Sequence, residues 1–446
     1  MSRPPRTTLA AAALAGVGVA AGLVVGCAPD VFTPCNSDDD CTRRELCVDG
    51  LCGAIGESPR PGGALARRPS ARGDLVVEVV DPVGEQEPPA EPPQAPNPDP
   101  EPDPTGDWID PGLLHRAVVT IQGIAGVQQD SVVDLPVLVA LDAADVGADF
   151  LAAARQRVLF TTLDGTPLAA ELDSDRGYQL FYWVKHTFDP RAELAVPERF
   201  YVYAGGETAL PTPESPTVWS TYFGVYHMGA ARNLLQPDSV GARAGDNEGA
   251  EAETVPCTVG DCLFFDGLDD RMVVPSAFPE LAGAAAATLS ATVRLTEISD
   301  SFIAVWSTPD RNRSRFFLGT DGNGVPQAAV RTNDLAPTLQ VADGGPPLAV
   351  GVEHRLDAVL DMVAGTVALF VDGQHRATDA FATTGALPAT VSAEAAVGAA
   401  SGLAVVDELD GRVDEVRIAT VARSADYLKV DAASRAGQLT VVMPEP

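Results

Sequence analysis

The stretch ATLSATVRLTEI, residues 287–298, alternates apolar and polar side chains. Successive side chains of a β-strand point to opposite faces, so this stretch would bury one face and keep the other polar. Similar short segments continue on both sides, and only residues 424–435 predict a helix. Residues 220–436 are therefore predicted to form an all-β domain. The apolar face of the quoted stretch would carry Leu289, Ala291, Val293 and Leu295.

Two Asp-Gly pairs predict hairpins within the β-rich regions. Asp372-Gly373 divides TVALFVDGQHRAT, residues 366–378, into two strand-like halves, and Asp164-Gly165 lies between RVLFTT and PLAAELD. Asp-Gly favours a type I′ turn because both central residues of that turn need a positive φ.

Three motifs of residues 220–436 resemble those of one known family. They are FDGLDD (265–270), DMVAGTVALFVDG (361–373) and GRVDEVRI (411–418). In this order they resemble the laminin-G-like, concanavalin A-like jelly roll. The resemblance implies a β-sandwich, but the fold serves lectins, adhesins, hydrolase appendages and spacers alike.

Residues 108–219 predict a second β-sandwich. Strand-like segments recur at the short spacing of such folds. Both faces of GYQLFYWVKHTF, residues 177–188, carry aromatic residues, which indicates a central strand. This part resembles an uncharacterised bacterial surface-protein domain that often precedes a laminin-G-like domain, and the resemblance implies no chemistry.

The amino terminus predicts export. Arg3 and Arg6 precede an apolar run that ends in VVGC, residues 24–27, and this pattern is typical of a signal peptide over 1–26. The tetrad resembles a bacterial lipobox, which implies lipidation of Cys27 and an anchor in the membrane of the cell envelope. The residue that follows the cysteine, Ala28, resembles that of lipoproteins sorted to the outer membrane. The alternative is an ordinary signal peptide with a chance cysteine.

Seven cysteines leave six after lipidation of Cys27. Four of them fall in residues 27–54, where so few core-forming residues occur that cross-links must hold the shape. Two disulfides are expected there, with zinc as the alternative and the pairing open. The segment resembles cysteine-rich modules of myxobacterial surface proteins. The four cysteines are Cys35, Cys41, Cys47 and Cys52, and a third disulfide is expected between Cys257 and Cys262.

Two segments are expected to lie outside the folded bodies. Residues 55–107 are acidic and rich in proline, which removes donors and fixes φ, so a disordered, extended linker is expected. Residues 437–446 are expected to form a C-terminal tail.

The net charge of −32 excludes nucleic acid as the main partner, because nucleic acid needs basic patches. Acidic loops could instead hold calcium, which prefers carboxylate and carbonyl oxygens. The calcium site is predicted at Asp266, Asp269, Asp270 and Asp414. The alternative is that these carboxylates only shape a turn and that Arg271 or Arg412 balances their charge.

The expected ligand is a carbohydrate or a matrix polymer. WSTPDRNRSR, residues 306–315, combines an aromatic ring with hydrogen-bonding side chains, as sugar sites often do. The predicted contacts are Trp306, Asp310, Arg311, Asn312 and Arg313. The alternative places Trp306 in the core above a solvated loop.

Catalysis is not expected. Glycosidases need two carboxylates beside the scissile bond. Glu408-Leu409-Asp410 resembles the start of the laminarinase-like signature, in which Glu, Asp and Glu follow at alternating and then third-residue spacing, but Val413 stands at the position of its second glutamate. The sequence thus favours a cell-envelope lipoprotein with a lectin-like jelly roll for adhesion or recognition. The alternatives are a structural protein that binds another envelope protein, and a polysaccharide-cleaving jelly roll.

Overall fold

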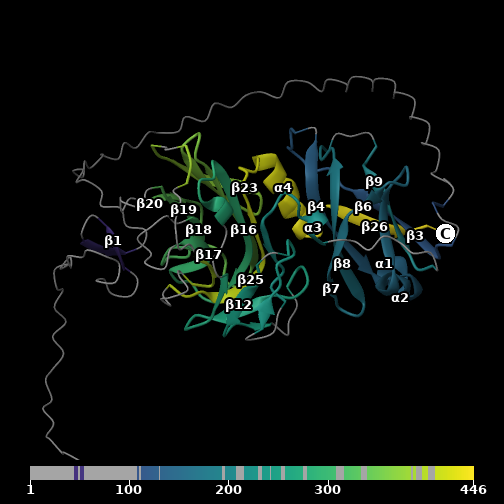
Figure 1. Ribbon diagram of the computed structural model, residues 1–446, viewed down its shortest axis with the longest axis horizontal. Helices are drawn as coiled ribbons and strands as arrows, with labels where there is room; N and C mark the ends of the chain where they lie inside the picture. Colours follow the sequence, from purple (N-terminus) through teal and green to yellow (C-terminus); the bar gives the residue numbers. More distant parts are fainter. Residues whose placement is uncertain are drawn as a thin grey trace, which may run out of the picture.

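The computed structural model describes two folded bodies and a short hairpin near the amino terminus (Figure 1). Of the hairpin only the backbone is described. The described residues are 45–48, 51–54, 108–109, 112–129, 131–192, 196–206, 215–229, 234–241, 243–252, 257–274, 279–307, 316–332, 339–382, 385–387, 394–399 and 407–445. The predicted signal peptide, Cys27, Cys35, Cys41 and the linker over 55–107 lie outside them.

The second body is a sandwich of two antiparallel sheets. In spatial order the first sheet contains β13 (Glu251–Ala252), β14 (Leu263–Asp266), β25 (Asp410–Ala419), β16 (Ala286–Leu295), β21 (Glu353–Asp361), β22 (Thr366–Val371) and β23 (Gln374–Ala380), with β10 (Gly224–Tyr226) beside β25. The second sheet contains β11 (Leu235–Gln236), β12 (Gly245–Glu248), β15 (Arg271–Val274), β24 (Glu394–Val397), β17 (Ser301–Ser307), β18 (Phe316–Thr320), β19 (Pro326–Arg331) and β20 (Leu339–Asp343).

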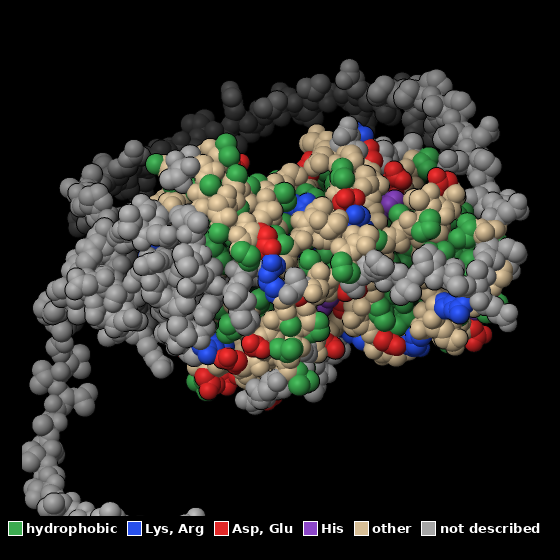
Figure 2. Space-filling model, viewed as in Figure 1, with side chains coloured by type: hydrophobic (Ala, Val, Ile, Leu, Met, Phe, Trp, Pro, Cys, Tyr) green, Lys and Arg blue, Asp and Glu red, His purple; other side chains and the backbone are tan. Residues whose placement is uncertain are grey.

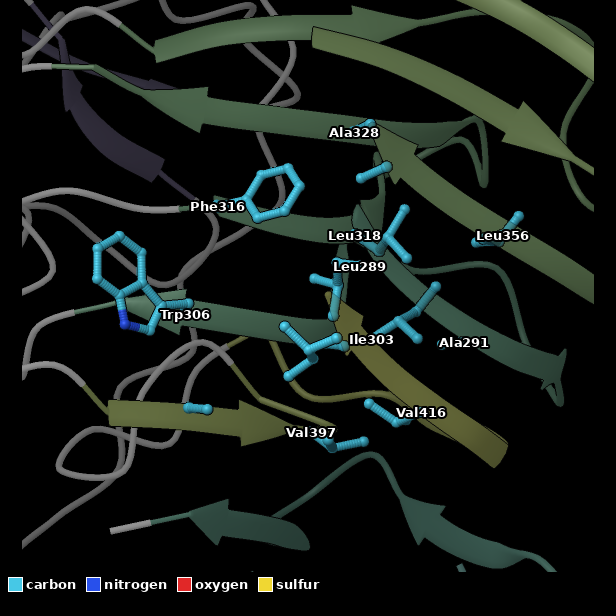
Figure 3. Packing of buried hydrophobic residues seen from close by; sticks show 14 of the residues in the cluster. Leu289, Ala291, Ile303, Trp306, Phe316, Leu318, Ala328, Leu356, Val397 and Val416 are labelled. Atoms are coloured by element: carbon cyan, nitrogen blue, oxygen red, sulfur yellow. The ribbon is translucent and has the colours of Figure 1, made fainter. Parts of the chain in front are cut away.

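The core of this sandwich lies between the two sheets (Figure 3). The alternation predicted for residues 287–298 is confirmed, since the apolar set of β16 belongs to this core. Ile303 and Leu318 from the opposite sheet pack into the same cluster. Burial of these side chains holds the sheets together at about 25 cal/mol for each Å² of apolar surface removed from water.

Both predicted hairpins form. Asp372 and Gly373 have φ of 52° and 70°, as a type I′ turn requires, and Val371 lies opposite Gln374. At the other hairpin only Gly165 has a positive φ, 87°, and Thr162 N donates to Thr166 O across a longer loop. The predicted type I′ turn is therefore replaced there by a wider one.

The first body also contains two antiparallel sheets, with a shared core between them. The aromatic residues on both faces of β8 (Gln179–Phe188) are explained by its central position in the smaller sheet. The larger sheet contains β26 (Thr440–Pro444), β3 (His115–Ile121), β9 (Arg199–Ala204), β5 (Val158–Thr162) and β6 (Pro167–Leu168), and the smaller one β4 (Val132–Asp142), β8 (Gln179–Phe188) and β7 (Ala170–Asp175).

Helices make the chain mostly β rather than all-β. The predicted carboxy-terminal helix is present as α4 (Ala425–Arg435), and Ser424 Oγ caps it by accepting from Tyr427 N. α1 (Ala143–Val146), α2 (Ala148–Gln156) and α3 (Ser215–Val218) were not predicted. In α2 the buried residues recur at helical spacing, which is the signal that the strand pattern around them obscured: Phe150, Leu151 and Ala154. Among the described residues, no helix has both the length and the apolarity to cross a membrane.

The predicted C-terminal tail at 437–446 is wrong. Thr440–Pro444 forms β26, the edge strand beside β3 of the first body, with Val442 opposite Val119. Figure 1 shows this yellow strand among the blue strands of the first body, with α4 between the two bodies. The chain thus returns from the jelly roll to complete the sheet that it began near residue 115.

The two bodies share one hydrophobic cluster. Val359 and Phe370 of the jelly roll, and Tyr427 and Leu428 of α4, are buried together with the core residues of the first body. A jelly roll isolated at residue 220 would expose these side chains to water. Binding and stability are therefore best measured on the whole chain after the predicted signal peptide.

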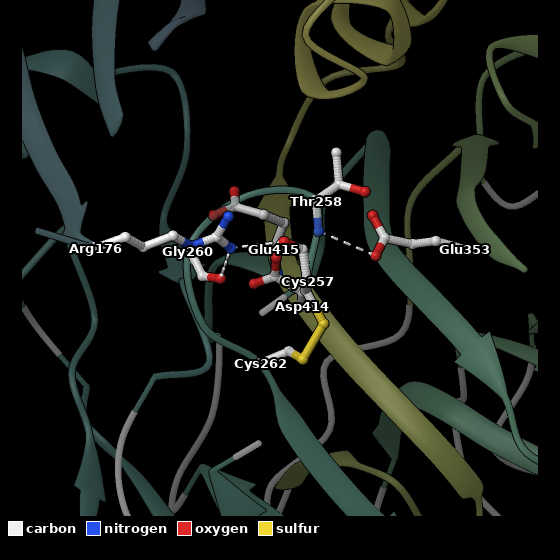
Figure 4. Close-up of a disulfide and its surroundings, with 8 residues drawn as sticks. All are labelled: Arg176, Cys257, Thr258, Gly260, Cys262, Glu353, Asp414 and Glu415. Carbon is white, nitrogen blue, oxygen red and sulfur yellow. Dashed lines mark hydrogen bonds between the residues drawn. A yellow bond between two sulfur atoms is a disulfide. The ribbon is translucent and has the colours of Figure 1, made fainter. Parts of the chain in front are cut away.

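The predicted disulfide between Cys257 and Cys262 is confirmed, with a Cα–Cα distance of 6.0 Å. Its loop lies between the bodies (Figure 4): Arg176 Nη2 of the first body donates to Cys257 O at 2.6 Å, and Thr258 N donates to Glu353 Oε2 of the jelly roll. In the amino-terminal hairpin of β1 (Glu45–Val48) and β2 (Leu51–Ala54), Cys47 lies opposite Cys52.

Candidate functional site

Three predicted calcium ligands meet in the turn between β14 and β15. Asp266, Asp269 and Asp270 each offer a carboxylate oxygen, and these oxygens lie within 4.8 Å of one another. Asp266 Oδ1 accepts from Leu268 N at 2.9 Å, and Asp270 Oδ2 accepts from Asp266 N at 3.0 Å. We refer to this turn, residues 266–270, as the acidic rim.

The acidic rim combines one buried and two exposed carboxylates. Asp270 is buried, while Asp266 and Asp269 are exposed. Gly249, at a φ of 102°, lets the Asp270 carboxylate approach its backbone, because a Cβ there would lie 2.1 Å from Asp270 Oδ1. Such an arrangement supplies several oxygen ligands and leaves an open side toward solvent, which suits a calcium ion.

Asp414 does not belong to the acidic rim, so this part of the prediction is wrong. The antiparallel register of β14 and β25 places Asp266 opposite Asp410. Asp414 lies four residues further along β25, about 13 Å away at the usual rise of a strand. Burial, with the charges of Glu297 and Asp266 nearby, raises the pKa of Asp410. Asp410 is therefore the acidic neighbour of the rim.

Of the arginines predicted as possible counter-charges, Arg271 directly follows the rim, and Arg412 lies opposite Phe264 in the register of β14 and β25. Arg271 Nε donates to Glu248 Oε2 at 2.6 Å, and the Arg412 guanidinium lies over the Phe264 ring at 5.9 Å.

Trp306 is a core residue, as the alternative interpretation of its segment proposed. Its side chain is 2% exposed and packs between the sheets beside Phe316 (Figure 3). A sugar needs an accessible ring face, so this indole cannot stack on a ligand. The other predicted contacts, Asp310, Arg311, Asn312 and Arg313, lie outside the described residues.

A β-bulge in β25 creates a second polar cluster that the sequence analysis did not predict. Ser290 of β16 pairs with Arg417, but Thr292 pairs with Asp414, so β25 contains one extra residue there. Glu415 sits in the bulge with a φ of 52°. Because a bulge changes which way side chains point, Asp414 and Glu415 both leave the sandwich core.

His227 joins the two bodies at this bulge. Its Nδ1 lies 2.5 Å from Glu415 Oε1 of the jelly roll and 3.0 Å from Asp173 Oδ2 of the first body. Its Nε2 lies 3.6 Å from Glu171 Oε2. Trp183 Nε1 also donates to Asp173 Oδ2, at 2.8 Å. Aromatic rings and carboxylates thus surround one imidazole at the junction.

The carboxylates set the protonation of His227. Burial alone would lower its pKa, but Glu415 and Asp173 raise that pKa well above the ordinary value. Burial raises the pKa of Asp414 strongly, and the charges of Glu415 and Asp173 add to the effect. Glu415 keeps its charge because His227 and Arg417 outweigh its burial and lower its pKa.

Arg417 is the central cation of the junction. It is 1% exposed, and its guanidinium lies 4.1 Å from the ring centre of Trp183 and 4.5 Å from that of Trp219. It pairs with Glu415 at 2.5 Å and with Asp431 of α4 at 3.3 Å. Asp173, His227 and Glu415 could geometrically hold a metal. The raised pKa of His227 favours its protonated form, which cannot bind a metal, and Arg417 already pairs with Glu415.

The sequence contains one signal for this cluster. In GRVDEVRI the core residues of β25 are Val413, Val416 and Ile418, a spacing of three and then two. An uninterrupted strand keeps a spacing of two. The partners in the first body, Glu171 and Asp173, gave no such signal.

The fold and motifs place the second body in a known class. Residues 266–429 match the family model Laminin_G_3, described as "Concanavalin A-like lectin/glucanases superfamily". The chain thus contains a laminin-G/concanavalin A-like jelly-roll domain, of a superfamily that includes lectins and glucanases. A search of curated proteins found no match.

Solved structures resemble parts of the chain at low scores. Domain 4 of the extracellular GH43 arabinanase AbnA from Geobacillus stearothermophilus, in complex with arabinotriose, has a TM-score of 0.37 and 16% identity, over 48% of this chain and 98% of that one. The heptameric SAP-like pentraxin from Limulus polyphemus has a TM-score of 0.32 and 12% identity, over 38% and 80%. The CBM40 of the Ruminococcus gnavus IT-sialidase, bound to α2,3-sialyllactose, has a TM-score of 0.29 and 16% identity, over 33% and 82%.

Proposed function

We propose that this protein is a lipid-anchored cell-envelope protein whose jelly roll binds carbohydrate or matrix polymer at the acidic rim, with calcium. The observation that carries the proposal is the convergence of Asp266, Asp269 and Asp270 within 4.8 Å at the solvent edge of a lectin/glucanase fold. A calcium ion held there by the carboxylates would keep positions open for the hydroxyl groups of a sugar.

The charge distribution supports a ligand other than nucleic acid. On the face shown in Figure 2, Lys and Arg side chains lie singly or beside Asp and Glu and form no continuous basic patch. Carbohydrates carry hydroxyl groups that carboxylates and a bound cation can contact. We expect binding without cleavage, since the Glu408-Leu409-Asp410 segment has no second glutamate at Val413. A hydrolysis assay on the bound polymer tests this.

Calcium is expected to stabilise the chain through the acidic rim. An ion that binds only the folded state raises its stability by about 2.7 kcal/mol at a hundred times its dissociation constant. The melting midpoint of residues 28–446 should therefore rise in millimolar calcium compared with chelator, and Asp269→Asn should abolish the rise. Asp343→Asn, at an exposed position of the same jelly roll, should keep it. Equal midpoints in calcium and chelator would refute the rim site.

Cys27 is expected to carry the anchor. Several acyl chains would bury enough CH₂ groups for stable attachment, at about 0.8 kcal/mol each. Cys27→Ser should leave an unprocessed precursor that takes up no labelled palmitate, while Cys257→Ser should still be lipidated. Normal processing of the Cys27→Ser chain would contradict the lipoprotein assignment.

A further inference from the structure

A cleft of ≈ 480 Å³ lies at the junction of the two bodies, separate from the acidic rim. Its volume falls within the range of small-molecule sites, which occur preferentially between domains. The walls come from the loop at Ile124, the disulfide loop, the outer face of the first jelly-roll sheet and the last turns of α4.

Small side chains of α4 create the space. One wall is lined by alanines of α4 and its C-cap, whose side chains end at Cβ: Ala432, Ala433 and Ala436. Nearer the start of the helix, longer residues tie it to the first body: Asp426 Oδ2 accepts from Gln129 N, and Lys429 Nζ donates to Ala125 O at 2.6 Å. The cleft therefore stays between elements that are held together elsewhere.

One buried cation of the wall keeps unused donors. Arg435 is 5% exposed, and its Nη1 donates to Glu415 O at 3.0 Å. Its Nη2 lies 3.6 Å from Asp431 Oδ2, beyond hydrogen-bond distance, and within the described part of the chain neither Nε nor Nη2 has a hydrogen-bond partner. Both nitrogens are buried beneath the cleft surface, so a ligand would reach them only after the Arg435 side chain turns toward the cleft. Because unsatisfied buried donors are costly, an acceptor that meets the turned side chain would be stabilised.

A histidine of the wall also has a buried nitrogen without a hydrogen-bond partner among the described residues. His354 Nδ1 lies 2.9 Å from Asp372 Oδ2, while its Nε2 is buried and has no hydrogen-bond partner among the described residues. His354 lines the cleft together with the carboxylates of Glu353 and Asp372 and with Asp414, whose raised pKa favours its protonated form.

This mixture of groups points to one chemical class. An anion would meet the carboxylates of Glu353 and Asp372, and a metal ion would meet Lys429 and Arg435. Hydroxyl groups both donate and accept, so they can satisfy both kinds of wall. We infer that the cleft binds a neutral, polyhydroxylated molecule with the chemistry of a sugar, in contact with Arg435 and His354, and that this binding does not need calcium.

Filling the cleft tests the inference. The probes are an array of neutral oligosaccharides and a matched array of uronic-acid oligosaccharides, both in chelator so that the acidic rim is inactive. The chain from residue 28 should bind one or more neutral sugars, and Ala436→Trp should weaken that binding at least tenfold. Ala425→Trp, exposed at the other end of the same helix, should bind as the unmodified chain does.

A second variant protects the test against misfolding. The double change Gln374→Ala and Gln438→Ala alters two exposed lining side chains and should also weaken binding, with an unchanged melting midpoint. Binding of uronic acids alone, no binding in chelator, or unchanged binding by Ala436→Trp and the double variant would each overturn the inference.

Discussion

Arg417→Ala is expected to lower the free energy of unfolding by about 3–5 kcal/mol, because it removes a buried cation that pairs with two buried carboxylates. Glu415 and Asp431 both pair with this guanidinium, and both are almost fully buried. The change also removes the cation that lies over the rings of Trp183 and Trp219.

Urea unfolding of the chain from residue 28 measures this effect. The matched control is Arg155→Ala, which breaks the exposed pair with Asp175 and should change stability far less. The two variants remove the same side chain from an ion pair, so their difference reports burial at the junction. Equal effects would mean that Arg417 does not hold the two bodies together.

His227→Gln is expected to destabilise the chain by about 3 kcal/mol near pH 6, since it removes the cation between Glu415 and Asp173. The carboxylates raise the pKa of His227 above its unfolded value. A raised pKa adds stability that is fully present below the unfolded pKa, about 6.5, and is lost as pH rises through the folded pKa. The difference between the unmodified chain and His227→Gln should therefore shrink as pH rises above neutral.

Stability curves at several pH values check this direction. His375→Gln, which changes an exposed histidine outside the junction, is the matched control. A difference that grows with pH would mean that His227 is neutral in the folded chain. The groups that face it are Glu171, Asp173 and Glu415, with Asp414 across the bulge.

Local features of the chain could be predicted from sequence. The alternation of β16, the Asp372-Gly373 turn, α4 and the bridge between Cys257 and Cys262 each depend on residues close together in the chain. Local periodicity and turn chemistry contain enough information for such elements.

Pairing between distant strands could not be predicted. Asp414 was assigned to the calcium site because no local signal gives the register of β14 and β25, which brings Asp410 to Asp266. The apolar residues of β26, Val441, Val442 and Met443, have no local feature that identifies β3 as their partner. The junction around His227 combines side chains from three strands and a loop in two bodies, so only the folded chain brings them together.

Calcium-dependent sugar binding at the acidic rim is the central claim, and a binding titration tests it most directly. The Ala436→Trp chain, in which the junction cleft is filled, is screened on a glycan array and titrated with the best-bound glycan in millimolar calcium and in chelator. The account predicts that the Ala436→Trp chain binds the glycan in calcium and that binding is lost in chelator. It also predicts that binding in calcium is lost when Asp269→Asn is added to this chain. Binding of equal strength in calcium and in chelator, or with Asp269→Asn, would contradict it.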